Sequence, residues 1–367
     1  MAGNVPRADL LGLTGAECIA WLRSHLGHAD RIHRAVYRDL MADGRFEPGR
    51  VPAFRLAADQ SPGLIERAAA LAVPDPVPPV IDAIRVEDPV HGTTIKVLTR
   101  THEGHRLESV LIPMGGARHH TLCVSTQVGC RMGCTFCHTA TMGLVRHLAP
   151  HEIVGQMLAV IRHTGIRPRN VVFMGMGEPL DNPEAVAQAV RVFTDPSGLA
   201  IAPRHVTVST VGRVDGLARW DELGLSRINL AVSLTAADDA VRSALMPVNR
   251  AMPLAALREA VSRIRVARGD RILFAVVVIP GVTDQPAQLD TLAAWLHGLP
   301  ALVNLIPYNP IPSRDWRAPT DAEVTAMWQA LVDRGIHTRL RITKGDAVMA
   351  ACGQLGDGRR RGGQAVA

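Results

Sequence analysis

From residue 121 onward, short apolar segments rich in β-branched residues alternate with longer segments of helical periodicity. When each strand is followed by a helix, neighbouring strands run parallel and the crossovers are right-handed. The strand–helix pairs are too few for a complete eight-fold barrel, so the sequence predicts an α/β fold with a partial (βα)6 barrel. The predicted strands are 121–125, 171–174, 206–210, 228–234, 272–279, 303–307 and 337–342, and the predicted helices are 150–163, 184–193, 215–223, 254–268, 285–297 and 320–333.

The part of the chain before this alternation is predicted to be different. Residues 1–85 are poor in strand signals and carry helical patterns, such as ADRIHRAVYRDLM at 29–41. A proline-rich stretch, VPDPVPPV at 73–80, predicts a boundary, and a β-hairpin is predicted over 93–112. We therefore predict a small N-terminal helical accessory domain that binds RNA (1–85), a linker and β-hairpin (86–120), the α/β core (121–355) and a basic flexible tail (356–367).

Composition limits the classes of function. The chain has 367 residues, 47% of them hydrophobic, with a formal net charge of +6 and a pI near 9.4, which favours a polyanionic partner. Its longest apolar run, 272–282, is interrupted by Pro280 and Gly281 and is too short to cross a bilayer, so no membrane partner is expected. The spacing of the six cysteines is not that of a disulfide scaffold, and a cytoplasmic location is expected.

Three of the cysteines form the sharpest motif, VGCRMGCTFCHTA, with Cys130, Cys134 and Cys137. Thiolates favour iron, and three of them on a [4Fe-4S] cluster leave one iron open to another ligand. Zinc is the alternative, but a structural zinc site needs four ligands, and His138 follows Cys137 too directly for good geometry.

Other polar residues follow the ends of the predicted strands, where βα barrels place their functional groups. Each of them could instead be a turn or a helix cap, but their common placement on one rim favours a ligand site. Glycines let a ligand approach the backbone, and a carboxylate can accept from an ammonium group. These residues are Gly177, Glu178, Ser209, Ser233, Leu234, Thr235, Asn309 and Cys352.

Several segments resemble the RlmN/Cfr family of radical S-adenosylmethionine (SAM) RNA methyltransferases. They occur in the family's order between residues 93 and 356. They are LESVLIP at 107–113, TLCVSTQVGC at 121–130, CTFC at 134–137, FMGMGEPL at 173–180, VTVSTVG at 206–212, VSL at 232–234, NLIPYNP at 304–310 and AACGQL at 350–355. The resemblance implies a radical SAM barrel, one [4Fe-4S] cluster with SAM on its open iron, and SAM contacts from Gly177, Glu178, Ser209, Ser233, Leu234, Thr235 and Asn309.

The resemblance also implies a mechanism. One SAM methylates Cys352, and a second is cleaved to a radical that activates this methyl group for addition to an adenine ring. Glu108 then removes the ring proton, and Cys123 attacks the sulfur of Cys352, which releases the methylated base and leaves a transient disulfide. Without the resemblance, Cys123 and Cys352 would be interpreted as buried apolar thiols and Glu108 as a solvated carboxylate.

The substrate is expected to be an adenosine of ribosomal RNA, with transfer RNA as an alternative or second target, and C2 is favoured over C8. An electron donor such as flavodoxin or ferredoxin is implied, and we expect a monomer. Two alternatives stay open, namely a radical SAM enzyme with a small-molecule or peptide substrate, and a non-catalytic RNA-binding protein with a structural metal. Candidate phosphate contacts are Arg31, Arg34, Arg38, Arg204, Arg339, Arg341 and Lys344.

Overall fold

The computed structural model describes residues 8–115, 118–266, 269–341, 349 and 351–356. Its centre is a ten-stranded sheet in the order β1-β2-β3-β4-β7-β8-β9-β10-β11-β12. From β4 to β12 each neighbouring pair is parallel, which confirms the predicted α/β class with a partial barrel. These strands are β4 (His119–Cys123), β7 (Asn170–Phe173), β8 (Val206–Thr210), β9 (Asn229–Ser233), β10 (Ile272–Val278), β11 (Ala301–Pro307) and β12 (Thr338–Leu340).

Helices follow these strands as predicted, with two differences in length. The helix predicted over 215–223 ends at Ala218, because the following residues form turns that bury Trp220. The helix predicted over 254–268 ends at Ser262, and residues 267–268 lie outside the described residues. An additional helix, α8 (Asp239–Leu245), was not predicted. The others are α5 (Pro150–Thr164), α6 (Pro183–Thr194), α7 (Val214–Ala218), α9 (Leu254–Ser262), α10 (Pro286–Leu296) and α11 (Asp321–Asp333).

Three antiparallel strands extend the sheet beyond β4. The predicted hairpin is formed by β2 (Thr94–Arg100) and β3 (Arg106–Met114), and β3 pairs with β4. The expectation that residues up to 85 contain little strand is wrong for β1 (Val80–Val86), which pairs with β2. This edge strand is only half-buried, so it lacks the strong apolar alternation by which strands are recognised.

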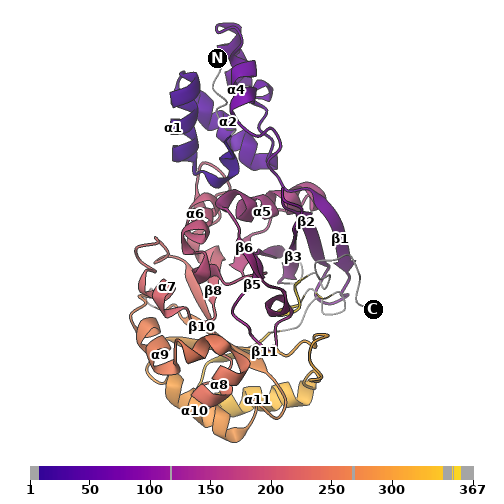
Figure 1. Cartoon of the computed structure of the whole chain (residues 1–367), viewed down its shortest axis with the longest axis vertical. Coiled ribbons are helices and arrows are strands. Elements are labelled where there is room, and N and C mark those ends of the chain that lie inside the picture. The colour runs from indigo at the N-terminus through magenta and orange to yellow at the C-terminus, as the bar shows by residue number, and fades with distance from the viewer. Residues whose placement is uncertain (1–7, 116–117, 267–268, 342–348, 350, 357–367) are drawn as a thin grey trace.

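The N-terminal helices lie at one end of the molecule, beyond α5 and α6 (Figure 1). Their apolar side chains are continuous with the core of the barrel, and the Gln188 amide of α6 donates to the Gly12 carbonyl at 2.8 Å. In the described part of the chain, no helix has the length and apolar character needed to span a membrane. The N-terminal helices are α1 (Gly15–Leu26), α2 (Asp30–Asp43), α3 (Pro52–Asp59) and α4 (Leu64–Leu71).

A small two-stranded sheet, which the sequence analysis did not predict, carries the three-cysteine motif. It pairs β5 (Gln127–Cys130) with β6 (Gly143–His147), and the 3-10 helix η3 (His138–Met142) lies between them. Gly129 has a φ of +76°, and a Cβ there would lie 1.8 Å from the Gly143 carbonyl oxygen. Only glycine permits this close pairing, which fixes where the cysteine loop begins.

Candidate active site

The cysteines of the motif converge at the start of the barrel. Cys130 ends β5, and Cys134 and Cys137 lie in the loop before η3. Burial raises the pKa of the Cys130 thiol to about 12 and also raises the pKa of Cys134 and Cys137, and Cys137 raises the pKa of the other two thiols further. Cys130 and Cys134 belong to one cluster of buried side chains, and Cys137 packs against this cluster.

These thiols fit an iron–sulfur cluster better than a single metal ion. Among the residues that the structure describes, no three His, Cys, Asp or Glu side chains are close enough to hold one ion, as zinc requires. In a [4Fe-4S] cluster each thiolate binds a different iron, so thiols that pack in one region without converging on a single point fit such a cluster. Apolar neighbours that include Met132, Met246 and Tyr308 shield the site from water.

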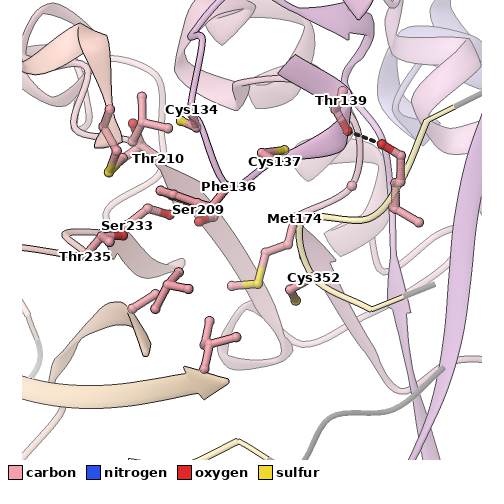
Figure 2. Close-up of a pocket in the computed structure, with 18 of the residues that line it drawn as sticks. Cys134, Phe136, Cys137, Thr139, Met174, Ser209, Thr210, Ser233, Thr235 and Cys352 are labelled. Carbon is pink, nitrogen blue, oxygen red and sulfur yellow. Dashed lines mark hydrogen bonds between the residues drawn. The ribbon is translucent and has the colours of Figure 1, made fainter. Parts of the chain in front are cut away.

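A cavity opens beside the cysteine loop at the carboxyl ends of the parallel strands (Figure 2). Leu234 does not line it, because this side chain is buried in the core, and its carbonyl accepts from Arg242 at 3.1 Å. The predicted residues that do line the cavity are Cys134, Cys137, Gly177, Glu178, Ser209, Ser233, Thr235, Asn309 and Cys352.

Glu178 is a buried carboxylate in the wall of this cavity. Its two oxygens accept from the backbone N–H groups of Leu180 at 3.0 Å and Val211 at 2.8 Å. Burial nevertheless raises the pKa of Glu178 to about 7. The preceding Gly177 has a φ of +104°, and a Cβ there would lie 2.7 Å from Gln127 Cβ, so glycine is required to bring this carboxylate to the rim.

Thr235 carries two signs of a functional position. Its φ is +61°, an uncommon backbone conformation for a β-branched residue. Its hydroxyl is also buried without a hydrogen-bond partner among the described residues, although buried polar groups are normally paired. A polar ligand in the cavity would satisfy this hydroxyl. Asn309, by contrast, already donates to the Cys352 carbonyl at 3.0 Å.

A second cavity adjoins the first. Its walls include Thr121 of β4 and Thr207 of β8. Cys123 and the cationic side chains of Arg339 and Arg341 also line it. Cys352 and Met174 line both cavities. The sequence analysis did not identify Met174, although its place at the end of the second barrel strand was a usable signal.

Cys352 lies between the cysteine loop and Cys123. The Cys352 thiol is close enough to Cys137 and to Cys123 to raise the pKa of both. Burial is the main reason that the pKa of Cys123 rises to about 12, and Arg341 opposes this shift. All of these cysteines are free thiols in the structure, and Cys123 and Cys352 both line the second cavity.

Glu108 lies on β3 and is buried, with 3% of its surface exposed. It forms an ion pair with Lys96 of β2 at 3.1 Å and accepts from the Gly356 N–H at 2.9 Å. Glu108 is not among the residues that line either cavity, although Val110, two residues further along β3, lines the second cavity. The sequence analysis missed Lys96, and the signal for it was a lone lysine inside the apolar strand TIKVLTR.

Five of the seven predicted phosphate contacts fall into two groups. Arg31, Arg34 and Arg38 are exposed along α2, whereas Arg339 and Arg341 line the second cavity. Arg204 is exposed before β8, and Lys344 lies outside the described residues.

Comparisons with known proteins show the family to which the chain belongs. Residues 124–292 match the Radical SAM superfamily model. The chain is 44% identical to the dual-specificity RNA methyltransferase RlmN of Syntrophobacter fumaroxidans, over 75% of this chain and 80% of that protein. It is also 44% identical to a probable RNA methyltransferase of Sorangium cellulosum, over 84% of this chain and 77% of that protein. A radical SAM methyltransferase structure from Sphaerobacter thermophilus superposes with a TM-score of 0.79 at 34% identity, covering 95% of this chain and 99% of that one.

Proposed function

This chain belongs to the RlmN family of radical SAM RNA methyltransferases, and on that premise we propose that it methylates C2 of an adenosine in ribosomal RNA through a methylated Cys352. The supporting observation is the place of Cys352, in a wall common to two cavities and beside both Cys137 and Cys123. Several relatives are described as dual-specificity enzymes, and we extend the proposal to transfer RNA as a second substrate.

In this proposal Cys130, Cys134 and Cys137 hold the [4Fe-4S] cluster, and the first cavity holds SAM. When bound, these groups supply the methyl group and the radical chemistry that links it to the ring carbon. The Glu178 carboxylate is placed to accept from the amino group of SAM, and the unpartnered Thr235 hydroxyl is placed to bind a polar atom of it. Gly177, Ser209, Ser233 and Asn309 complete the SAM contacts, and flavodoxin or ferredoxin is the expected electron donor.

The second cavity receives the adenine, and its arginines attract the RNA phosphates. Once the base is bonded through the methylene group to Cys352, the ring has to lose one proton and one electron to become aromatic again. Glu108, two residues from the cavity-lining Val110, takes the proton, and the electron would pass to the bound cluster. The Cys123 thiolate then attacks the Cys352 sulfur. A sulfur–sulfur bond forms, the sulfur–carbon bond breaks, and its electron pair goes to the carbon, which takes up a proton to become the methyl group. A cellular thiol reduces the resulting disulfide.

A Cys123→Ala variant tests this assignment. Without the second thiol the adduct cannot be resolved, so RNA is expected to stay covalently bound to the peptide that contains Cys352. The variant is produced in cells with its cluster intact, digested and analysed by mass spectrometry, which also identifies the attached nucleotide. The matched control is Cys18→Ala, because Cys18 is buried in α1, outside both cavities.

The control should carry no RNA and should yield methylated product. If Cys352 carries neither a methyl group nor RNA in the Cys123→Ala variant and in the wild type, the mechanism is refuted and a small-molecule or peptide substrate becomes the better hypothesis. Mass spectrometry of nucleosides from the digested RNA separates 2-methyladenosine from 8-methyladenosine, and an 8-methyl product would correct the proposed position.

A further inference from the structure

The segment that carries Cys352 is bound to the protein from two sides. On one side it contacts the cysteine loop, where the His138 N–H donates to the Gly353 carbonyl at 2.6 Å and the Thr139 hydroxyl donates to the Leu355 carbonyl. The Gln354 amide also donates to the Pro310 carbonyl, in the segment after β11, at 3.1 Å. These bonds hold Cys352 against the first cavity.

On the other side, one buried ion pair binds both flanks of the segment. The Lys96 ammonium donates to the Met349 carbonyl at 3.0 Å, and the Glu108 carboxylate accepts from the Gly356 N–H at 2.9 Å. The two side chains bond to each other at 3.1 Å and are only 5% and 3% exposed. They come from adjacent strands, β2 and β3, so a rigid part of the sheet holds residues on both sides of Cys352.

The charge on Glu108 contributes to this attachment. A charge-assisted hydrogen bond is roughly twice as strong as a neutral one, and a buried cation that loses its counter-charge is poorly accommodated. A proton on Glu108 would therefore weaken both its bond to Lys96 and its bond to Gly356. In the proposed function this proton comes from the ring carbon, at the step just before Cys123 has to reach the Cys352 sulfur.

We propose that Lys96 is a positioning residue that, with Glu108, fastens the Cys352 segment to the sheet, and that transfer of the ring proton to Glu108 loosens this segment so that Cys123 can resolve the adduct. The fastening depends only on contacts within the chain. The timing of the release rests on the proposed function, in which Glu108 is the base.

Hydrogen exchange of the cluster-loaded enzyme without RNA tests the fastening. In Lys96→Met, amides of the peptide that covers 351–356 are expected to exchange about tenfold faster or more, whereas amides of α5 stay unchanged. Lys96→Arg keeps the cation and should remain close to wild type. Glu108→Gln imitates the protonated carboxyl group and should loosen the same peptide.

Lys96→Met alone leaves a buried carboxylate without its counter-charge, and this could misfold the protein. The double variant Lys96→Met/Glu108→Gln removes both buried charges and avoids this problem. Its Cys352 peptide should exchange as fast as in Lys96→Met. Unchanged protection of this peptide in the double variant, with α5 intact, would overturn the fastening.

The reaction itself separates the fastening from the role of the base. Glu108→Gln should accumulate the covalent RNA adduct while both cysteines are present. If Glu108→Gln loosens the segment but releases methylated RNA at the wild-type rate, the fastening stands, whereas the proposed base and the timed release both fail. If the adduct accumulates and the segment stays protected, the base is supported and the release is refuted.

Discussion

At the scale of single residues, the pKa of Glu178 links burial to cofactor binding. Its value of about 7 means that the free protein holds a proton on this carboxyl group below neutrality and loses it above. An amino group donates much more strongly to the ionised carboxylate than to the protonated form, so below pH 7 tight binding of SAM has to displace the proton. Binding of SAM by the cluster-loaded enzyme is therefore expected to be about tenfold weaker near pH 6 than near pH 8, as measured by titration calorimetry.

Glu178→Gln is the control for this effect, because it keeps the size of the side chain and removes the titration. The variant should bind SAM weakly and almost equally at both pH values. The contribution of Glu178 to the stability of the fold changes with pH in the opposite direction. Since the pKa is raised on folding, the protonated carboxyl group favours the folded state, and this contribution is lost as the pH rises through 7. A wild-type SAM affinity that does not change between the two pH values would contradict this role of Glu178.

The sequence could predict which residue types gather at the rim, but not which side chains face the cavity. Leu234 ends the matching segment VSL and Thr235 follows it directly, yet Leu234 is a core residue and Thr235 lines the cavity in a left-handed conformation. The ion pair of Lys96 with Glu108 was equally hidden, because it depends on the register between β2 and β3. Register and local backbone angles are set by tertiary packing, which no short motif contains.

At the scale of elements, the β5–β6 hairpin decides where the cluster thiols lie. The matched pair of variants is Gly129→Ala and Gly104→Ala, since both glycines have positive φ values, of +76° and +90°. Both substitutions have a backbone cost of about 1 kcal/mol, but only the Cβ at 129 meets backbone, whereas the Cβ at 104 meets no atom within 4 Å. Gly129→Ala is expected to lose at least half of its bound iron, and Gly104→Ala should retain it.

Iron content per protein and circular dichroism of the two purified variants are the measurements. The fold should survive in both, because β5 and β6 lie outside the ten-stranded sheet. Equal iron content in the two variants would show that the tight pairing at Gly129 does not position the thiols. The β5–β6 hairpin could not be predicted from the sequence because its strands are short, glycine-containing and bulged. The barrel strands could be predicted because they are apolar runs.

At the scale of the whole molecule, the N-terminal helices and the barrel share one continuous core. RNA that contacts α2 is therefore held by a body that is packed against the catalytic barrel. The sequence predicted the helical character of this region, but its docking on α5 and α6 depends on long-range contacts such as that between Gln188 and Gly12. If α2 binds RNA, substrate affinity and substrate chemistry lie in different parts of the chain that share one core.

A test of this arrangement is the effect on RNA binding of removing the exposed arginines of α2. Replacing Arg31, Arg34 and Arg38 with glutamine removes three cations from α2, all of them exposed. If each arginine contacts a phosphate, the affinity should fall for every RNA sequence. The magnitude of the slope of the logarithm of the RNA-binding constant against the logarithm of salt concentration should become smaller by about 2 to 3. In the proposed mechanism, methylation of Cys352 needs SAM but no RNA, so it should persist. Filter binding at several salt concentrations and mass spectrometry of Cys352 measure the two effects.

A triple variant of exposed arginines elsewhere, Arg219, Arg263 and Arg317, provides the control for net charge. Each of these arginines is ion-paired with a glutamate, so their loss lowers the total charge equally without removing the α2 face. The control should keep its salt slope close to that of the wild type. If both triple variants lose affinity to the same extent, the RNA responds to overall charge, and α2 has no special part in holding it. If only the α2 variant loses affinity while Cys352 stays methylated, binding of the RNA and preparation of the cysteine are separate functions of the two parts of the chain.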